Sequence, residues 1–328
     1  MYRVLLAVLL FLGTFFLLTH YSEGYKWLEV LATGQLGWIV LALFLEVFFL
    51  ANLAGFYQAI FASLDIKVPF VHLFRLVLAS SFMGLVAPLG ALSGTALIVS
   101  DGTRRGISMA RGVLANLIFY LFDYAVFCLI MLAALGYLHF KGHFSPYEGM
   151  AALLMLLFVG IQIAFLLWTK IYPEGLARCL DKVISLLGFV FFPWREWFSS
   201  LKVREFACHL AEALDWLASR PHGLWHVAGH ALLAKLLSIS TLGATWAAFA
   251  DDVSFGPLVT SYSVGVLFTI ISITPSGIGV VEGIMTAVLV SFGVEPARAA
   301  LITLAYRGIS LWLPFIGGML SLHHLRSQ

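Results

Sequence analysis

Two charged residues stand out because both lie in strongly apolar sequence near the C-terminal end. Glu282 follows a break in an apolar run, in the stretch TPSGIGVVEGIM (274–285), and Arg307 lies midway along the next run, 297–320. A charge inside a membrane is costly unless it is paired. We therefore predict that Glu282 and Arg307 form an ion pair. Either the pair only holds the structure together, or it opens when a phosphate binds Arg307 and Glu282 takes a proton or a headgroup amine.

The break before Glu282 has the character of an anion site. Residues 274–277 interrupt the helix, so the helical piece after them begins with backbone N–H groups that lack intrahelical partners. Such groups and the helix dipole favour a phosphate, and glycines permit tight turns and close approach of a ligand. An earlier stretch, APLGALSG (87–94), is built in the same way. The predicted substrate-binding residues at the two breaks are Ser93, Gly94, Thr274, Pro275, Ser276, Gly277 and Gly279.

Other polar residues within apolar runs are weaker candidates for contact with a substrate. None of them forms a nucleophile–base arrangement, and no nucleotide loop or metal-ligand spacing is present. The three cysteines, Cys128, Cys179 and Cys208, are scattered and resemble small core residues. We therefore expect no metal and no cofactor. The weaker candidates are Glu46, Asn52, Asn116, Asp123, His230 and Lys235.

The composition is that of a polytopic helical membrane protein. Of the 328 residues, 61% are hydrophobic and 11% are charged, whereas soluble domains carry about 25% charged residues. The first apolar run follows Arg3 and could pass for a signal peptide, but no small-x-small site follows it closely. We therefore favour an uncleaved first span. The net charge of +2 and the lack of a basic tract give no indication of a nucleic-acid partner.

The apolar runs predict about six full spans and two re-entrant hairpins. The runs 70–100 and 257–292 are each divided by a break into pieces too short to cross a bilayer. With this topology both termini share one side, which then holds fourteen Lys and Arg residues against Lys26, Lys141 and Arg298 on the other. This bias makes the first side cytoplasmic. The predicted full spans are 3–20, 35–62, 108–139, 148–171, 222–250 and 297–320.

The chain is predicted to form one membrane domain, 1–328, with a cytoplasmic amphipathic segment at 173–221. Apolar residues recur at helical spacing in this segment, for example Leu210, Leu214 and Leu217. We expect two amphipathic helices that lie on the membrane or under the bundle, and docking of a partner is the alternative. Three arginines are predicted to lie at the cytoplasmic headgroup level, where basic residues commonly hold anionic headgroups, although plain positive-inside anchoring is the favoured explanation: Arg104, Arg105 and Arg111.

A shift of 187 residues superposes the two broken runs without gaps. Pro88 then falls on Pro275, Gly90 on Gly277, and Arg111 on Arg298. By the charge argument the two hairpins enter from opposite sides, so the repeats, about 35–139 and 222–320, would be inverted. Inverted repeats with broken helices are typical of alternating-access transporters, although chance similarity of Gly/Pro-rich segments is the alternative. The shift places Glu282 on Thr95 and Arg307 on Tyr120, so one repeat has both charges and the other has neither.

The stretch TPSGIGVVEGIMTAVLVSFGVEPARAALITLAYRGISLWLP (274–314) resembles the C-terminal signature of the lysylphosphatidylglycerol synthase transmembrane (flippase-domain) superfamily. PLGALSGTALIVSDGTRRGIS (88–108) is similar to its first signature, although Thr95 stands where many members have an acidic residue. The resemblance covers essentially the whole chain. It implies movement of a lipid or lipid-linked headgroup between leaflets. Residue by residue it points to Pro275, Gly277, Gly279, Glu282, Tyr306 and Arg307.

The sequence and the resemblance together predict a lipid flippase or scramblase in the cell membrane, with no enzymatic activity. The best-known family members carry an aminoacyl transfer domain after the membrane part, and this chain ends at Gln328, so we expect that it does not aminoacylate lipid by itself. The alternatives are an integral-membrane enzyme or subunit acting on lipid-linked substrates, and a lipid-binding scaffold. The expected partners are anionic or phosphate-containing membrane lipids. A homodimer or a lipid-biosynthesis partner is also compatible with the sequence.

Overall fold

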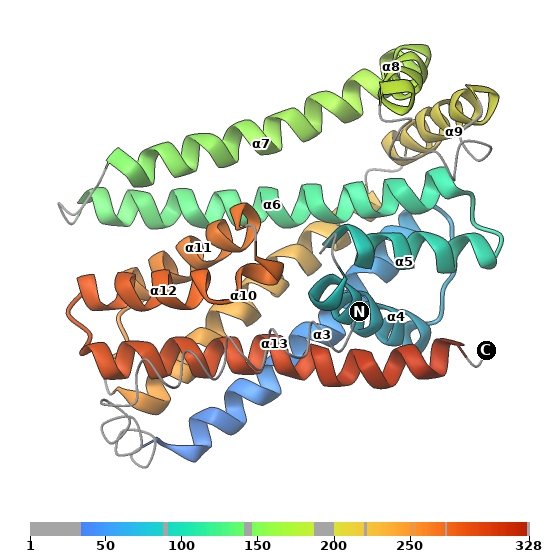
Figure 1. Cartoon of the computed structure of the whole chain (residues 1–328). Coiled ribbons are helices and arrows are strands. Elements are labelled where there is room, and N and C mark those ends of the chain that lie inside the picture. Colours follow the sequence, from blue (N-terminus) through green and yellow to red (C-terminus); the bar gives the residue numbers. More distant parts are fainter. Residues whose placement is uncertain are drawn as a thin grey trace.

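The described part of the chain, in a computed structural model, is entirely helical (Figure 1). The structure describes residues 34–87, 91–140, 146–186, 200–219, 222–250, 252–272 and 274–326. The helices are α3 (Leu36–Ser63), α4 (Phe70–Val86), α5 (Ala91–Arg104), α6 (Met109–Phe140), α7 (Pro146–Ile171), α8 (Pro173–Leu186), α9 (Ser200–Ala218), α10 (His222–Phe249), α11 (Phe255–Ile271), the 3-10 turn η3 (Pro275–Gly277), α12 (Val280–Ser291) and α13 (Pro296–Arg326).

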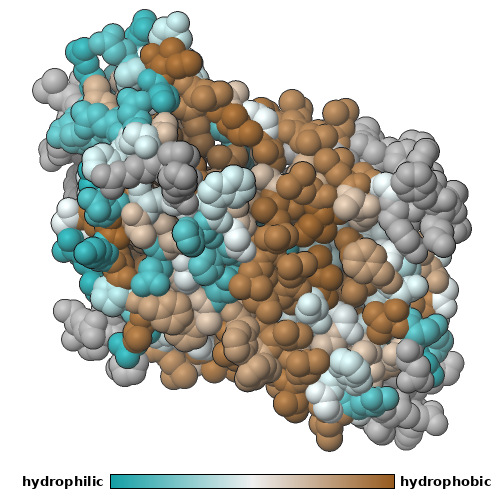
Figure 2. Space-filling view, turned by 180° about the vertical axis from the view of Figure 1, so that it is seen from behind, coloured by the Kyte–Doolittle hydropathy of each residue, from teal (hydrophilic) through white to brown (hydrophobic). Residues whose placement is uncertain are grey.

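Four helices coincide with predicted full spans and are long and apolar enough to cross a membrane: α3, α6, α10 and α13. The run 148–171 is helix α7, whose described part is bent by 112° against α8 at a short break. The first predicted span, 3–20, lies outside the described residues. Apolar side chains form a band across the middle of the molecule in Figure 2, and hydrophilic ones gather at the end that carries α8 and α9. This distribution suits a bundle surrounded by lipid.

Both broken runs form helical hairpins. Helix α4 packs against α5, and α11 packs against α12. At the end of α4 and of α11 the backbone turns extended, with ψ of 148° at Ala87 and 139° at Ser272. Each of these helices has 17 residues, so it rises only about 25 Å and does not span a hydrocarbon core of about 30 Å. The helical hairpins are thus present as predicted, and their re-entry into a membrane remains a prediction.

The helix bounds agree with the 187-residue shift. Helix α6 begins at Met109 and α13 at Pro296, and α3 and α10 begin at Leu36 and His222. Even the turns correspond, because Gly106 (φ 82°) and Gly293 (φ 89°) both adopt the left-handed conformation that favours glycine. Each of these glycines donates its backbone N–H to the carbonyl three residues earlier, at Thr103 and Val290. The second arm of each hairpin therefore ends in the same kind of turn.

Helices α3 and α10 pack closely against each other and run in opposite directions. Helices α6 and α13 also run in opposite directions (Figure 1). Two hydrogen bonds join α3 to α10: the Asn52 amide donates to the His230 carbonyl at 2.9 Å, and the His230 ring lies 2.7 Å from the Asn52 amide oxygen. These two polar residues thus hold the helices together, which gives them a structural role. Each hairpin also packs on the long helix of the other half, α4 on α13 and α11 on α6.

The two amphipathic helices lie under the bundle. Leu210, Leu214 and Leu217 of α9 are buried in one cluster with residues of α3 and α6, and Leu176 of α8 joins the same cluster. Helix α9 packs against α6, α7 and α8. Since the apolar face of α9 is occupied by the bundle, the helix closes one end of the bundle and does not lie with that face in lipid. The linker FFPWREWF lies outside the described residues.

A buried ion pair that the sequence did not predict joins the two halves. The Lys235 Nζ on α10 lies 2.7 Å from the Asp123 carboxylate on α6, and the side chains are 9% and 17% exposed. The Lys235 ammonium also lies 5.9 Å from the centre of the Phe127 ring. Removing one partner of a buried pair leaves an uncompensated charge, whereas replacing both is often neutral.

Lys235→Met is therefore expected to lower the free energy of unfolding by about 3–5 kcal/mol. Asp123→Leu combined with Lys235→Met should recover most of this loss. Thermal or denaturant unfolding in detergent measures both. Lys170→Met is a matched control, because Lys170 pairs with Asp215 in an exposed bridge (39% and 64% exposed) that contributes little. A Lys235→Met variant as stable as Lys170→Met would contradict the structural role of the buried pair.

Candidate functional site

Three residues in the turn before α12 have positive φ angles, in the left-handed region that favours glycine. Ser276 has φ 52°, Gly277 φ 71° and Gly279 φ 86°. A Cβ added to Gly277 would collide with the side chain of Val281, so this position requires glycine for space as well as for its backbone angles. The Gly277 N–H donates to the Thr274 carbonyl at 3.0 Å, which closes the turn. The break in the run therefore folds into a compact turn with a defined shape.

Glu282 and Arg307 form the predicted ion pair. The Arg307 Nε donates to Glu282 Oε1 at 2.9 Å, and the two side chains are 9% and 16% exposed. A second guanidinium nitrogen, Nη2, donates to the Ser276 carbonyl at 2.6 Å. Glu282 Oε2 in turn accepts the Gly279 N–H at 2.7 Å. Three charge-assisted hydrogen bonds thus tie the turn, the start of α12 and the middle of α13 together.

This network corrects one expectation about the break. We predicted free N–H donors at the start of α12, but the Glu282 carboxylate already occupies one of them, the Gly279 N–H. A carboxylate in the first helical turn suits the helix dipole and takes the place that a phosphate would have. A ligand phosphate can therefore use the Gly279 N–H and the Nε of Arg307 only after Glu282 has moved away or has been neutralised.

The first half has a neutral counterpart at the same two positions. The Thr95 hydroxyl lies 3.0 Å from the Tyr120 hydroxyl, and these residues are the ones that the 187-residue shift places on Glu282 and Arg307. Both contacts join the second arm of a hairpin to the following long helix. The ion pair of one half is thus replaced in the other half by an uncharged hydrogen bond in the same place.

A cavity of about 410 Å³ lies at the centre, between the two hairpins. Gly84 and Gly94 of the first hairpin line it together with Thr269 and Ser276 of the second. Glu46 of α3 also lines it and is 2% exposed. The volume is in the range of small-ligand sites, about 300–1,000 Å³. Further hydroxyl-bearing side chains that line it are Tyr57, Ser80, Ser81, Tyr120 and Ser310.

The ion pair lies behind the cavity wall. Ser276 lines the cavity and its carbonyl accepts from Arg307, but neither Arg307 nor Glu282 is among the lining residues. Among the described residues, the side chains that line the cavity are apolar or carry hydroxyls, with Glu46 as the one charged group. In this conformation the cavity therefore presents no cation, and the guanidinium of Arg307 is one layer away.

The structure brings only some of the predicted site residues to the cavity or to the turn behind it. Gly94 and Ser276 line the cavity, and Gly277, Gly279, Glu282 and Arg307 build the turn behind it. The Thr274 hydroxyl is engaged by Ser272 at 2.8 Å. Tyr306 packs against the core cluster on the α11 side, and Ser93 is half-buried, so neither is brought to the cavity. Pro275 lies in η3.

The three predicted anchoring arginines lie near the junction of α5 and α6, away from the cavity. Arg105 is held by neighbours: its Nε donates to Asp101 at 3.2 Å, and its Nη2 lies 2.8 Å from the His72 ring. Arg104 is exposed. Arg111 lines a separate pocket with Arg105.

Sequence reasoning missed most of the cavity-lining hydroxyls and treated Glu46 only as a weak candidate. Serines and tyrosines are common in membrane helices, so their type gives no signal. One signal was available in Pro314, which lies inside α13. A proline cannot donate a backbone hydrogen bond, so the Ser310 carbonyl lacks its helical partner. Both residues line the cavity, and the helix is thus weakened where it borders the site.

Comparison with known proteins gives a family. The model of the family described as "Lysylphosphatidylglycerol synthase TM region" matches residues 4–318. Comparison with the curated proteins found no match. The match covers nearly the whole chain, and together with the helix lengths it indicates a multi-pass membrane protein. The chain therefore belongs to the family of lysylphosphatidylglycerol synthase transmembrane regions.

Proposed function

We propose that the chain moves a phosphate-containing lipid between the two membrane leaflets by alternately exposing the central cavity. The observation that carries this proposal is the position of the cavity, which is lined by residues of both hairpins and has Arg307 directly behind the turn of the second one. The family supports a lipid-related function in the membrane. Acyl chains would remain in the bilayer while the headgroup crosses through the cavity.

The opposite directions of corresponding helices support an inverted repeat. Helix α3 runs opposite to α10, and α6 runs opposite to α13 (Figure 1). The bounds of these helices follow the 187-residue shift. Inverted repeats with broken helices near the midplane give two conformations of similar energy that open to opposite sides. In this proposal both hairpins are re-entrant and enter from opposite sides. The excess of Lys and Arg on one side supports a cytoplasmic location of both termini in a protein of the cell membrane.

The Glu282–Arg307 pair would act as a latch on the second turn. While it is closed, Arg307 holds the Ser276 carbonyl and the turn forms part of the cavity wall. A phosphate that enters the cavity offers Arg307 a better anion, because bidentate Arg–phosphate contacts are strong. Glu282 would then take a proton or a headgroup amine. The hydroxyl groups that line the cavity would donate hydrogen bonds to the phosphate while it crosses.

Liposomes that contain the purified chain and a fluorescent phosphatidylglycerol test the proposal. A membrane-impermeant reductant bleaches only the probe in the outer leaflet of empty liposomes. With the protein present we expect bleaching to continue into the inner-leaflet pool. In parallel liposomes that receive no reductant, the recovered lipid should have an unchanged mass, because the chain is proposed to be a transporter. A chemically altered lipid would instead support the alternative, an integral-membrane enzyme or a subunit of one.

A further inference from the structure

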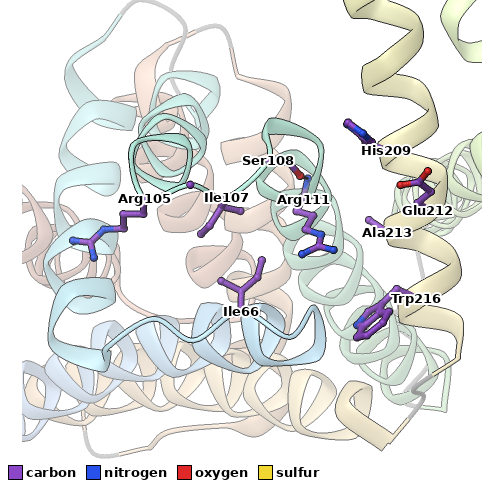
Figure 3. A pocket seen from close by; sticks show the side chains of 10 residues that line it. Ile66, Arg105, Ile107, Ser108, Arg111, His209, Glu212, Ala213 and Trp216 are labelled. Atoms are coloured by element: carbon purple, nitrogen blue, oxygen red, sulfur yellow. Dashed lines mark hydrogen bonds between the residues drawn. The ribbon is translucent and has the colours of Figure 1, made fainter.

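Two pockets of similar size lie at corresponding places in the two halves. One, of about 530 Å³, lies where α5 meets α6 (Figure 3). The other, of about 520 Å³, lies where α12 meets α13, at the opposite end of the molecule (Figure 1). Both are remote from the central cavity, with which they share no lining residue. The 187-residue shift superposes Ile66, Gly106, Ile107 and Arg111 of the first on Val253, Gly293, Val294 and Arg298 of the second.

The two pockets differ in the state of their equivalent arginines. Arg298 is paired with Glu295 at 3.5 Å, and Asp252 lines the same pocket. At the position of Glu295 the first pocket has Ser108, whose hydroxyl accepts the Arg111 backbone N–H at 3.4 Å. Within the residues that the structure describes, the Arg111 guanidinium makes no ion pair. The first pocket therefore has a cation available for a ligand, whereas the cation of the second already has a carboxylate.

The first pocket also has an additional wall, which α9 provides. Figure 3 shows Arg111 on α6 facing the side of α9 that carries His209, Glu212 and Trp216. The Arg105 side chain points away from α9, in keeping with its bonds to Asp101 and His72. The wall is fixed in place because the apolar side of α9 is buried in the bundle. A cation and a carboxylate thus face each other across one pocket of about 530 Å³.

We propose that this pocket binds a phosphodiester headgroup that also carries a hydroxyl or amine. The phosphate would lie on Arg111, which offers several N–H donors to it. The hydroxyl or amine would lie toward Glu212, which as a carboxylate only accepts hydrogen bonds. The counterpart pocket should bind such a headgroup more weakly, because two carboxylates, Asp252 and Glu295, line it beside Arg298 and repel a phosphate. This goes beyond the proposed function, since it describes a second, one-sided site whose occupancy needs no transport.

Equilibrium binding to the full chain in detergent tests the site. The probes are glycerophosphoethanolamine and glycerophosphoglycerol, the water-soluble portions of two phospholipid headgroups, with inorganic phosphate for comparison. Arg111→Gln is expected to weaken binding of both headgroup compounds by at least about tenfold, and the matched variant Arg298→Gln should leave it unchanged. Glu212→Gln should weaken both compounds but not inorganic phosphate.

Several results would overturn the proposal. Unchanged binding in Arg111→Gln, or loss of binding in Arg298→Gln, would mean that the pocket is wrong. Inorganic phosphate that binds as tightly as the headgroup compounds would contradict the headgroup assignment. Lipid nanodiscs with phosphatidylglycerol provide the membrane-bound source, and the same dependence on Arg111 is expected there. If lipid transport is absent while binding depends on Arg111, the proposed function fails and this inference stands. If lipid is transported but headgroup binding does not depend on Arg111, this inference fails and the proposed function stands.

Discussion

Glu282→Gln is expected to lower the free energy of unfolding by about 3–5 kcal/mol, because Arg307 then remains buried without its carboxylate. Arg307 is 9% exposed and would keep only neutral acceptors, the Ser276 carbonyl and the amide oxygen of the introduced glutamine. Arg307→Gln should destabilise the chain by a similar amount, since it leaves the carboxylate behind. Both variants should also reduce lipid transport in liposomes by more than about tenfold. Unfolding in detergent and the flux assay measure the two effects separately.

The first half of the molecule supplies the control for this prediction. Thr95 and Tyr120 stand at the equivalent positions and form a neutral contact of 3.0 Å. Glu282→Thr combined with Arg307→Tyr is therefore expected to recover stability to within about 1–2 kcal/mol of the parent, as neutral replacements of buried pairs often do. The double variant should still not transport lipid, because no cation remains behind the cavity wall. Recovery of transport together with stability would mean that the pair is only structural.

Gly94→Val is expected to disrupt the first hairpin. A Cβ at Gly94 would lie 2.5 Å from the Ser80 carbonyl oxygen and 2.7 Å from the Ser80 hydroxyl. Because the carbonyl belongs to the backbone of α4, it cannot move aside as a side chain could. Helices α4 and α5 would have to separate where they line the cavity. Overpacking of this kind lowers the free energy of unfolding by about 1–3 kcal/mol or more. We expect a clear loss of thermal stability and of lipid flux.

Gly136→Ala is the matched control for the hairpin variant. This glycine lies within α6, and nothing lies within 4 Å of a Cβ built there. The substitution should be neutral or stabilise the helix by about 0.5–1 kcal/mol, because alanine has the higher helix propensity. If Gly94→Val is tolerated as well as Gly136→Ala, the close contact of α4 with α5 does not form the cavity wall.

The pairing of Glu282 with Arg307 was predictable because the chain contains its own comparison. One repeat has both charges and the other has neither, which indicates that the two depend on each other. The main helices were also predictable, since the apolar runs and the breakers set their bounds. The contact of Lys235 with Asp123 was not, because a sequence does not give the rotation of one long helix against another. For the same reason the sequence could not show that Arg307 lies behind the cavity wall, although it was expected at the substrate site.

The role of the N–H donors before α12 also depended on geometry. Glu282 lies three residues after Gly279, and this spacing serves a helix cap as well as a ligand gate. The sequence allowed both, and the 2.7 Å bond to the Gly279 N–H identifies the cap. Likewise, residues 173–221 were predicted as amphipathic helices on the membrane or under the bundle, and the burial of Leu210 and Leu214 identifies the second arrangement.

The flux of phosphatidylglycerol in liposomes tests the central claim most directly, when the parent chain is compared with the Glu282→Thr/Arg307→Tyr variant at equal protein content. The parent chain is expected to make the inner-leaflet probe accessible to the reductant, and the equally folded double variant is expected to leave it protected. Protection of the inner-leaflet probe with the parent chain, whether a proton gradient is applied or not, would contradict the proposed transport of a phosphate-containing lipid.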